Sequence, residues 1–375
     1  MVHIRYIDNS NDFEFCRYAS ACRHRKEFQM QFGHFDDQQR EYVITDPRTP
    51  LPWINYLGSE DFFTLLSNTA GGYCFYRDAR LRRLTRYRYN NCPVDQEGFH
   101  IYIKDGKTVW NPGWQPTKTE LDRYTCRHGL GYSVIEGQKN GVSAAQTLLV
   151  PQGENCLLIR LCLKNETDIK KTLDVFPYVE FCLWDAMDDS SNFQRNFSIG
   201  EVEMEPEAIY HKSEYRERRN HYAVLWANRP YDGFDTARDA FIGPYGSPAL
   251  PEAVAAGCCT GSIAHGWAPV GAMQFHLELC PGESQELFFG LGYVENPESE
   301  KFSAPGVINK TRAHTMIETY RTAAQFDAAA DALRGYWDTL LSNYHAETGD
   351  EKVDRMVNIW NQYQCMVTFN MSRSA

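Results

Sequence analysis

Residues 273–279 read Met-Gln-Phe-His-Leu-Glu-Leu, so apolar and polar side chains alternate along this stretch. In an extended chain the four apolar side chains share one face and the three polar ones share the other. Pro281-Gly282 then turns the chain into the apolar run 287–289. The pattern predicts a strand with one buried face, and it indicates that antiparallel sheet is the basic element of the fold.

Similar strands lie on the N-terminal side of this stretch. Residues 99–103 and 108–110 flank Asp105-Gly106, and residues 132–136 and 142–150 flank Asn140-Gly141. Both dipeptides tolerate the positive φ of a two-residue hairpin turn. Strand signals with short turns continue to about residue 294, which predicts a mainly β fold, a large antiparallel sandwich of two sheets.

The pattern changes near Pro305, where helices are predicted. Apolar residues then recur at spacings of three and four, as on one face of a helix. An earlier helix is predicted around residues 309–321, and the last pattern still continues at Ala375. The first stripe is Phe326, Ala330, Leu333, Trp337, Leu340 and Tyr344, and the second is Val353, Met356, Val357, Trp360, Tyr363 and Val367.

Composition excludes several classes of function. The formal charge of −11 argues against nucleic acid as a partner, because phosphate binding needs a basic surface. Twelve cysteines without a CxxC pair predict buried thiols in a reducing, cytoplasmic compartment and no metal site. No apolar run is long enough for a membrane span, and the N-terminus lacks the apolar stretch of a secretion signal.

Two segments hold polar groups that could carry chemistry. Arginines interleave with tyrosines over residues 76–89, which favours a strand whose arginine face is paired to carboxylates over an anion site. Residues 184–200 are predicted to form a long polar loop after an apolar strand. Its amides, carboxylates and Arg195 are equally compatible with sugar binding and with turns that satisfy their own backbone. The neighbouring pairs Asp36/Asp37 and Asp188/Asp189 do not by themselves make opposed catalytic carboxylates.

Long strings of the sequence resemble cellobiose phosphorylases of glycoside hydrolase family 94, formerly glycosyltransferase family 36. They span Met30 to Ala375. The strings are residues 33–37, 41–45, 52–58, 70–73, 82–88, 114–118, 127–132, 180–184, 192–196, 215–219, 292–297 and 360–366.

The resemblance implies a super-sandwich, a helical linker and then an (α/α)6 barrel. The domains expected are a non-native upstream extension at 1–29, the super-sandwich at 30–300, the linker at 301–348 and the truncated start of the barrel at 349–375. It also implies reversible, inverting phosphorolysis of cellobiose to glucose 1-phosphate and glucose, with inorganic phosphate as co-substrate and no cofactor. A carboxylic acid protonates the glycosidic oxygen while phosphate attacks from the opposite face. That acid is expected beyond Ala375, so this fragment alone is expected to be inactive.

The resemblance further implies a homodimer in which a sandwich loop of one subunit reaches the edge of the other subunit's active site. On that basis Arg195, Asn192 and Gln194 are the predicted substrate-binding residues. Asp185 stands where relatives often carry Asn, so no role is assigned to it. Two alternatives remain open: a sister phosphorylase acting on cellodextrin, laminaribiose or chitobiose, and a stand-alone carbohydrate-binding or dimerisation module without catalysis.

Overall fold

The computed structural model describes residues 31–58, 60–87, 99–190, 198–215, 219–266 and 268–372. The chain divides into two units, Met1–Phe32 and Gly33–Ala375, and the fold below is that of the second. The predicted upstream extension at 1–29 therefore lies outside the described residues.

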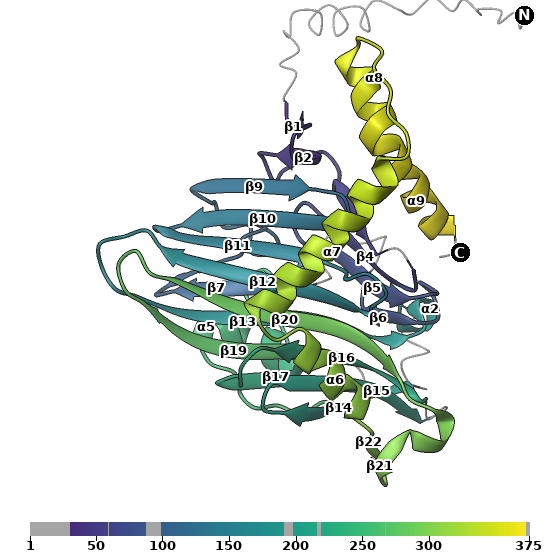
Figure 1. Ribbon diagram of the computed structural model, residues 1–375. Coiled ribbons are helices and arrows are strands. Elements are labelled where there is room, and N and C mark those ends of the chain that lie inside the picture. The colour runs from purple at the N-terminus through teal and green to yellow at the C-terminus, as the bar shows by residue number, and fades with distance from the viewer. Residues whose placement is uncertain are drawn as a thin grey trace, which may run out of the picture. The chain divides into compact units, whose positions relative to one another are not determined.

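Two large antiparallel sheets dominate the unit, as the alternating pattern predicts (Figure 1). Among the described residues, one sheet has 11 strands. Their order is β1 (Gly33–Asp36), β2 (Glu41–Ile44), β9 (Arg123–His128), β10 (Tyr132–Lys139), β11 (Val142–Leu149), β12 (Cys156–Asn165), β20 (Ser284–Glu295), β16 (His221–Ala227), β15 (Ala208–Tyr215), β14 (Ser198–Glu205) and β18 (His265–Gly266).

The second sheet has nine strands in the same described part of the chain. Its main order is β17 (Gly233–Ala237), β19 (Pro269–Leu279), β13 (Lys171–Trp184), β6 (Arg83–Thr85), β5 (Gly72–Tyr76), β4 (Phe62–Ser67) and β3 (Ile54–Leu57), and β7 (Phe99–Asp105) pairs with both β13 and β8 (Thr108–Trp110). A separate two-stranded ribbon joins β21 (Phe302–Ala304) to β22 (Val307–Ile308).

The predicted strand and hairpins are confirmed. In β19 the four apolar side chains of 273–279 are buried, whereas His276 and Glu278 are exposed. Asn140 and Gly141 adopt φ values of 51° and 73° between β10 and β11, as a tight hairpin turn requires. Gly106, with φ 59°, turns β7 into β8 in the same way. The main core lies between the two sheets, where side chains such as Leu148 and Phe275 are fully buried.

Helices cover both outer faces of the sandwich. The short helices α4 (Arg238–Ile242) and α5 (Glu252–Ala256) pack on the nine-stranded sheet, where Phe241 stacks on Tyr178 with ring centroids 4.8 Å apart. On the 11-stranded sheet lie α6 (Thr311–Thr319) and α7 (Ala323–Leu341), with α7 crossing the strands obliquely (Figure 1).

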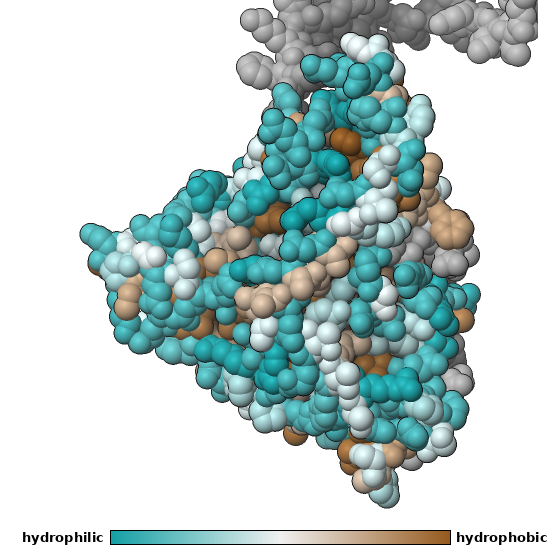
Figure 2. Space-filling view, in the orientation of Figure 1, coloured by the Kyte–Doolittle hydropathy of each residue, from teal (hydrophilic) through white to brown (hydrophobic). Residues whose placement is uncertain are grey.

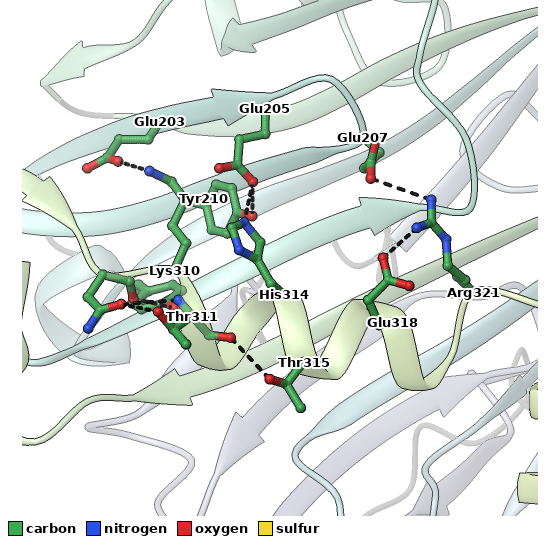
Figure 3. A network of polar contacts seen from close by, with 12 residues as sticks. Glu203, Glu205, Glu207, Tyr210, Lys310, Thr311, His314, Thr315, Glu318 and Arg321 are labelled. Carbon is green, nitrogen blue, oxygen red and sulfur yellow. Dashed lines mark hydrogen bonds and ion pairs between the residues drawn. The ribbon is translucent and has the colours of Figure 1, made fainter. Parts of the chain in front are cut away.

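Helix α6 is positioned on the sheet by charge as well as by apolar contact (Figure 3). Lys310 lies 2.5 Å from Glu203, and His314 lies 2.8 Å from Glu205. Arg321, just beyond the helix, lies 3.5 Å from Glu207. The successive carboxylates 203, 205 and 207 thus pair with groups spread along one side of the helix.

The chain continues through α8 (Glu351–Arg355), a π-helical segment (Met356–Trp360) and α9 (Asn361–Ser372). The two predicted apolar stripes are wrong at their ends. Leu341 is buried in place of Leu340, and Tyr344 is exposed because α7 has ended. In the last helix the π-helical turn shifts the side-chain direction. The buried residues there are Ile359, Tyr363 and Val367.

Candidate functional site

The candidate site is the end of the sandwich where β13 leads into residues 191–197. The strand finishes at Trp184, which is fully buried and has φ 71°. Residues 186–190 then form the short helix α2 (Ala186–Ser190), so the prediction of a continuous loop from 184 to 200 is wrong for this part. Asp185 explains the helix, because its Oδ1 accepts hydrogen bonds from the amides of Met187 and Asp188.

The predicted substrate-binding residues Asn192, Gln194 and Arg195 lie outside the described residues. The structure describes the two ends of their segment, α2 before it and β14 after it. It therefore shows how the residues just before this segment are held.

A buried ion pair fixes the end of α2. Arg86, directly after β6, donates from Nε and Nη2 to both carboxylate oxygens of Asp189, at 2.7 and 2.8 Å. Each of these side chains is 3% exposed. The amide of Leu183 also donates to Asp189, at 3.3 Å. Two parallel charged hydrogen bonds fix orientation as well as distance, so the last turn of α2 is held against the sheet.

Glu180 extends this pair into a cluster of four charges. One carboxylate oxygen lies 3.3 Å from Nη1 of Arg86, and the other accepts from the Tyr178 hydroxyl at 2.8 Å and from Nε of Arg238 at 2.9 Å. With Asp189, the cluster holds two positive and two negative groups. Such mutual neutralisation is what makes buried charge tolerable. We name Arg86, Glu180, Asp189 and Arg238 the stem cluster.

The electrostatics of the stem cluster keep Glu180 and Arg86 ionised. Burial alone would raise the pKa of Glu180, but Arg86, Arg238 and the Tyr178 hydroxyl together lower it. Burial likewise opposes the charged form of Arg86, yet Asp189 and Glu180 raise its pKa. A carboxylate held ionised is not a proton donor near neutral pH, so Glu180 is unsuited to be a general acid.

Two histidines pack against the C-terminal end of β13. His211 stacks on Phe181 and on Trp184, with ring centroids 4.9 and 5.9 Å apart. His221 meets Trp184 edge-on at 4.4 Å. Burial lowers the pKa of each histidine to about 3, so both are neutral at physiological pH. They act as aromatic packing groups, and the sequence analysis did not identify them because their spacing is that of ordinary strand residues.

The described part of the arginine-rich segment, residues 76–87, adjoins the end of β13 through β6. The expected pairing to carboxylates is present: Arg77 lies 2.6 Å from Asp61, and Arg82 lies 2.8 Å from Glu295. The prediction of one strand is wrong, because residues 77–82 form the turn between β5 and β6. Arg77 and Arg82 of this turn therefore pair with separate carboxylates, as the interpretation of the segment as paired arginines expects.

The last helix is tied to the sandwich through Tyr363. Its buried hydroxyl donates to the carbonyl of Tyr56 at 2.7 Å, and Asn55 Oδ1 is a second acceptor within hydrogen-bond distance. The amide of Gly131 donates to the hydroxyl oxygen of Tyr363 at 3.2 Å. Gly131 has φ 80° and lies against Trp337, where a Cβ would approach the indole to 3.2 Å. The α9 helix is therefore part of the packed unit.

The part of the chain that the structure describes contains no group of three or more His, Cys, Asp or Glu side chains placed to hold a metal ion. None of its helices has the length and apolar character of a membrane span.

Comparison with known families identifies the class of protein. Residues 40–323 match the family described as "Glycosyl hydrolase 94, supersandwich domain", and residues 336–375 match "Glycosyl hydrolase 94 superfamily, catalytic domain". The first match covers most of the chain. The chain therefore belongs to glycoside hydrolase family 94.

Individual relatives are phosphorylases of this family. The N,N'-diacetylchitobiose phosphorylases of Vibrio proteolyticus and Vibrio furnissii are 32% and 33% identical, each over 92% of this chain and 42% of the relative. A 3-O-beta-D-glucopyranosyl-beta-D-glucuronide phosphorylase of Paenibacillus borealis is 28% identical over 91% of this chain and 42% of the relative. The chain thus spans less than half the length of these relatives.

Proposed function

We propose that this chain supplies the sandwich domain and the start of the catalytic domain of a phosphorylase that cleaves a disaccharide with inorganic phosphate, with inversion. The observation that carries the proposal is the match of successive parts of one chain to both domains of the family. The packing of α9 on the sandwich through Tyr363 supports it, because the two matched regions form one unit.

The proposed reaction needs a carboxylic acid that protonates the glycosidic oxygen, and the stem cluster does not supply one. Glu180 and Asp189 are buried, and each is paired with arginine. We propose that the acid belongs to a part of the family's catalytic domain other than the part matched by residues 336–375. The role proposed for this chain is to shape the edge of an active site.

For that role we propose Arg195, Asn192 and Gln194 as contacts to the sugar or phosphate of the partner subunit in a homodimer. In support, the stem cluster fixes the residues immediately before them. A guanidinium and two amides are also groups suited to hydroxyl and phosphate oxygens.

Cellobiose is the disaccharide that the sequence motifs favour, and N,N'-diacetylchitobiose is the second candidate. The second is supported by the two Vibrio relatives, whose names specify that substrate. The two sugars differ at the 2-position, which is a hydroxyl in one and an acetamido group in the other.

The test is a phosphorolysis assay of a protein that joins this chain to a complete catalytic domain. We expect sugar 1-phosphate from cellobiose or from N,N'-diacetylchitobiose only when phosphate is present, and the preferred disaccharide follows from the ratio of kcat/KM values. An Arg195→Ala variant should raise KM for sugar or phosphate without changing the unfolding midpoint. Hydrolysis without phosphate, or no cleavage of any β-linked disaccharide, would refute the proposed reaction.

A further inference from the structure

A cavity of about 760 Å³ lies between α7 and the 11-stranded sheet. Its walls come from three parts of the chain: the turn between β1 and β2, strands β9 to β11, and the C-terminal half of α7. Figure 2 shows a small hydrophobic patch among hydrophilic side chains in the region beside α7. The volume lies within the range of roughly 300–1,000 Å³ that is typical of small-molecule sites.

The carboxylates of the cavity are already paired within the fold. Glu41 accepts from the Tyr132 hydroxyl at 2.6 Å and lies 3.6 Å from Arg127. Asp338 accepts from Arg40 at 2.6 Å. Asp36 accepts from two backbone amides of its own turn. These acids hold neighbouring groups in place, and they do not form an open cation site.

The arginines of the cavity, by contrast, have more N–H donors than their ion pairs use. Arg40 uses Nη1 for Asp338, and Arg334 uses Nη1 for Asp331. Arg127 uses Nη1 for Glu136, at 2.7 Å. A guanidinium has five N–H groups, so each of the three can donate further hydrogen bonds. A ligand that fits this cavity is therefore rich in acceptors.

The formal charge and the apolar residues of the cavity further restrict the class of ligand that it can bind. Three arginines face three carboxylates along the lining, so its formal charge is zero and a phosphate gains little net attraction. The lining also includes apolar side chains, among them Leu333 and Trp337 of α7. A pyranose combines apolar C–H faces with hydroxyls that accept and donate, and it carries no charge.

We propose that this cavity binds a neutral carbohydrate. Arg40, Arg127 and Arg334 donate to its hydroxyls, and the side chains of α7 contact its C–H face. This inference does not depend on the proposed phosphorolysis, because it concerns binding by the residues described here.

The test is isothermal titration of the 375-residue chain with glucose, N-acetylglucosamine, cellobiose, glucose 1-phosphate and inorganic phosphate. We expect at least one neutral sugar to bind. Arg334→Ala should weaken that binding about tenfold, as expected for loss of a hydrogen bond from a charged group. Ala330→Trp, which fills the space beside α7, should abolish it. The matched control is Arg77→Ala, an exposed arginine with a single carboxylate partner outside the cavity, and it should bind like the wild type.

Unchanged circular dichroism and unfolding midpoints establish that the variants are folded. Binding of phosphate or glucose 1-phosphate without binding of any neutral sugar would overturn the ligand class. Equal sugar affinity in the wild type and in both cavity variants would overturn the location, and absence of binding to all three neutral sugars would overturn the proposal as a whole.

Discussion

Replacing Asp189 with alanine removes the main partner of a buried guanidinium. Arg86 is 3% exposed and makes its two shortest charged hydrogen bonds to this carboxylate, at 2.7 and 2.8 Å. Its remaining partner, Glu180, is 3.3 Å away and is already shared with Arg238. The variant therefore leaves one excess positive charge in a dry environment.

The expected cost is about 3 kcal/mol in the free energy of unfolding, the lower end of the range for breaking a buried pair on one side, because Glu180 still offers partial compensation. The double variant Arg86→Met with Asp189→Ala removes both charges and should recover about half of that loss, compared with the single variants Asp189→Ala and Arg86→Met. The non-additivity of the cycle measures the pair itself, separately from packing losses at either position.

The assay is urea unfolding of the 375-residue chain, followed by tryptophan fluorescence and circular dichroism. The control is Asp61→Ala, which breaks the exposed pair with Arg77 and should cost no more than about 1 kcal/mol. An Asp189→Ala variant no less stable than this control would refute the reasoning. So would a double variant that loses the full sum of its two single losses.

Three further outcomes are expected. Burial raises the pKa of Glu180, but its charged and hydroxyl partners lower that pKa overall, so the folded pKa lies below the unfolded value of about 4.3. The stabilisation that Glu180 contributes is therefore complete above the unfolded pKa and is lost as the pH falls through the folded pKa. In Glu180→Gln the urea midpoint should fall less steeply as the pH is lowered. Tyr363→Phe should cost about 1 kcal/mol and speed amide exchange in α9 more than in β19, and equal exchange would contradict the anchoring role. Gly290→Ala places a Cβ 1.9 Å from the Trp226 ring and should lower the free energy of unfolding by about 1–3 kcal/mol. Gly335→Ala meets open space, so its thermal unfolding midpoint should be unchanged or higher.

Local pattern was sufficient to predict much of the fold. Alternation identified β19, and the Asn-Gly and Asp-Gly dipeptides identified two hairpins, because these signals depend on neighbours in sequence. The helical stripes were predicted less well at their ends. A π-helical turn at 356–360 changes which side chains face the sheet, and a fixed period of three and four residues does not anticipate it.

The candidate site was less predictable, because its contacts are distant in sequence. Arg86 and Asp189 are 103 residues apart. The sequence showed an arginine-rich segment and an acidic segment, but the pairing of one with the other follows from β6 lying beside β13. The function of Asp185 was missed for a different reason: its role is to cap a five-residue helix within what appeared to be a polar loop.

The outer face of the 11-stranded sheet explains why the helices after residue 310 are more than a connection. Strand side chains on that face, such as Leu158 and Phe288, are buried beneath α6 and α7, and Tyr363 joins α9 to the same cluster. Without the helices this apolar surface would be exposed to water, so sandwich and helices stabilise one another. Helix α9 lies in the region that matches the catalytic domain, and the hydrogen bond of Tyr363 fixes this helix on the sandwich. The stem cluster, in the same packed unit, sets where residues 191–197 begin. The positions of α9 and of α2 are thus both set by contacts within this chain.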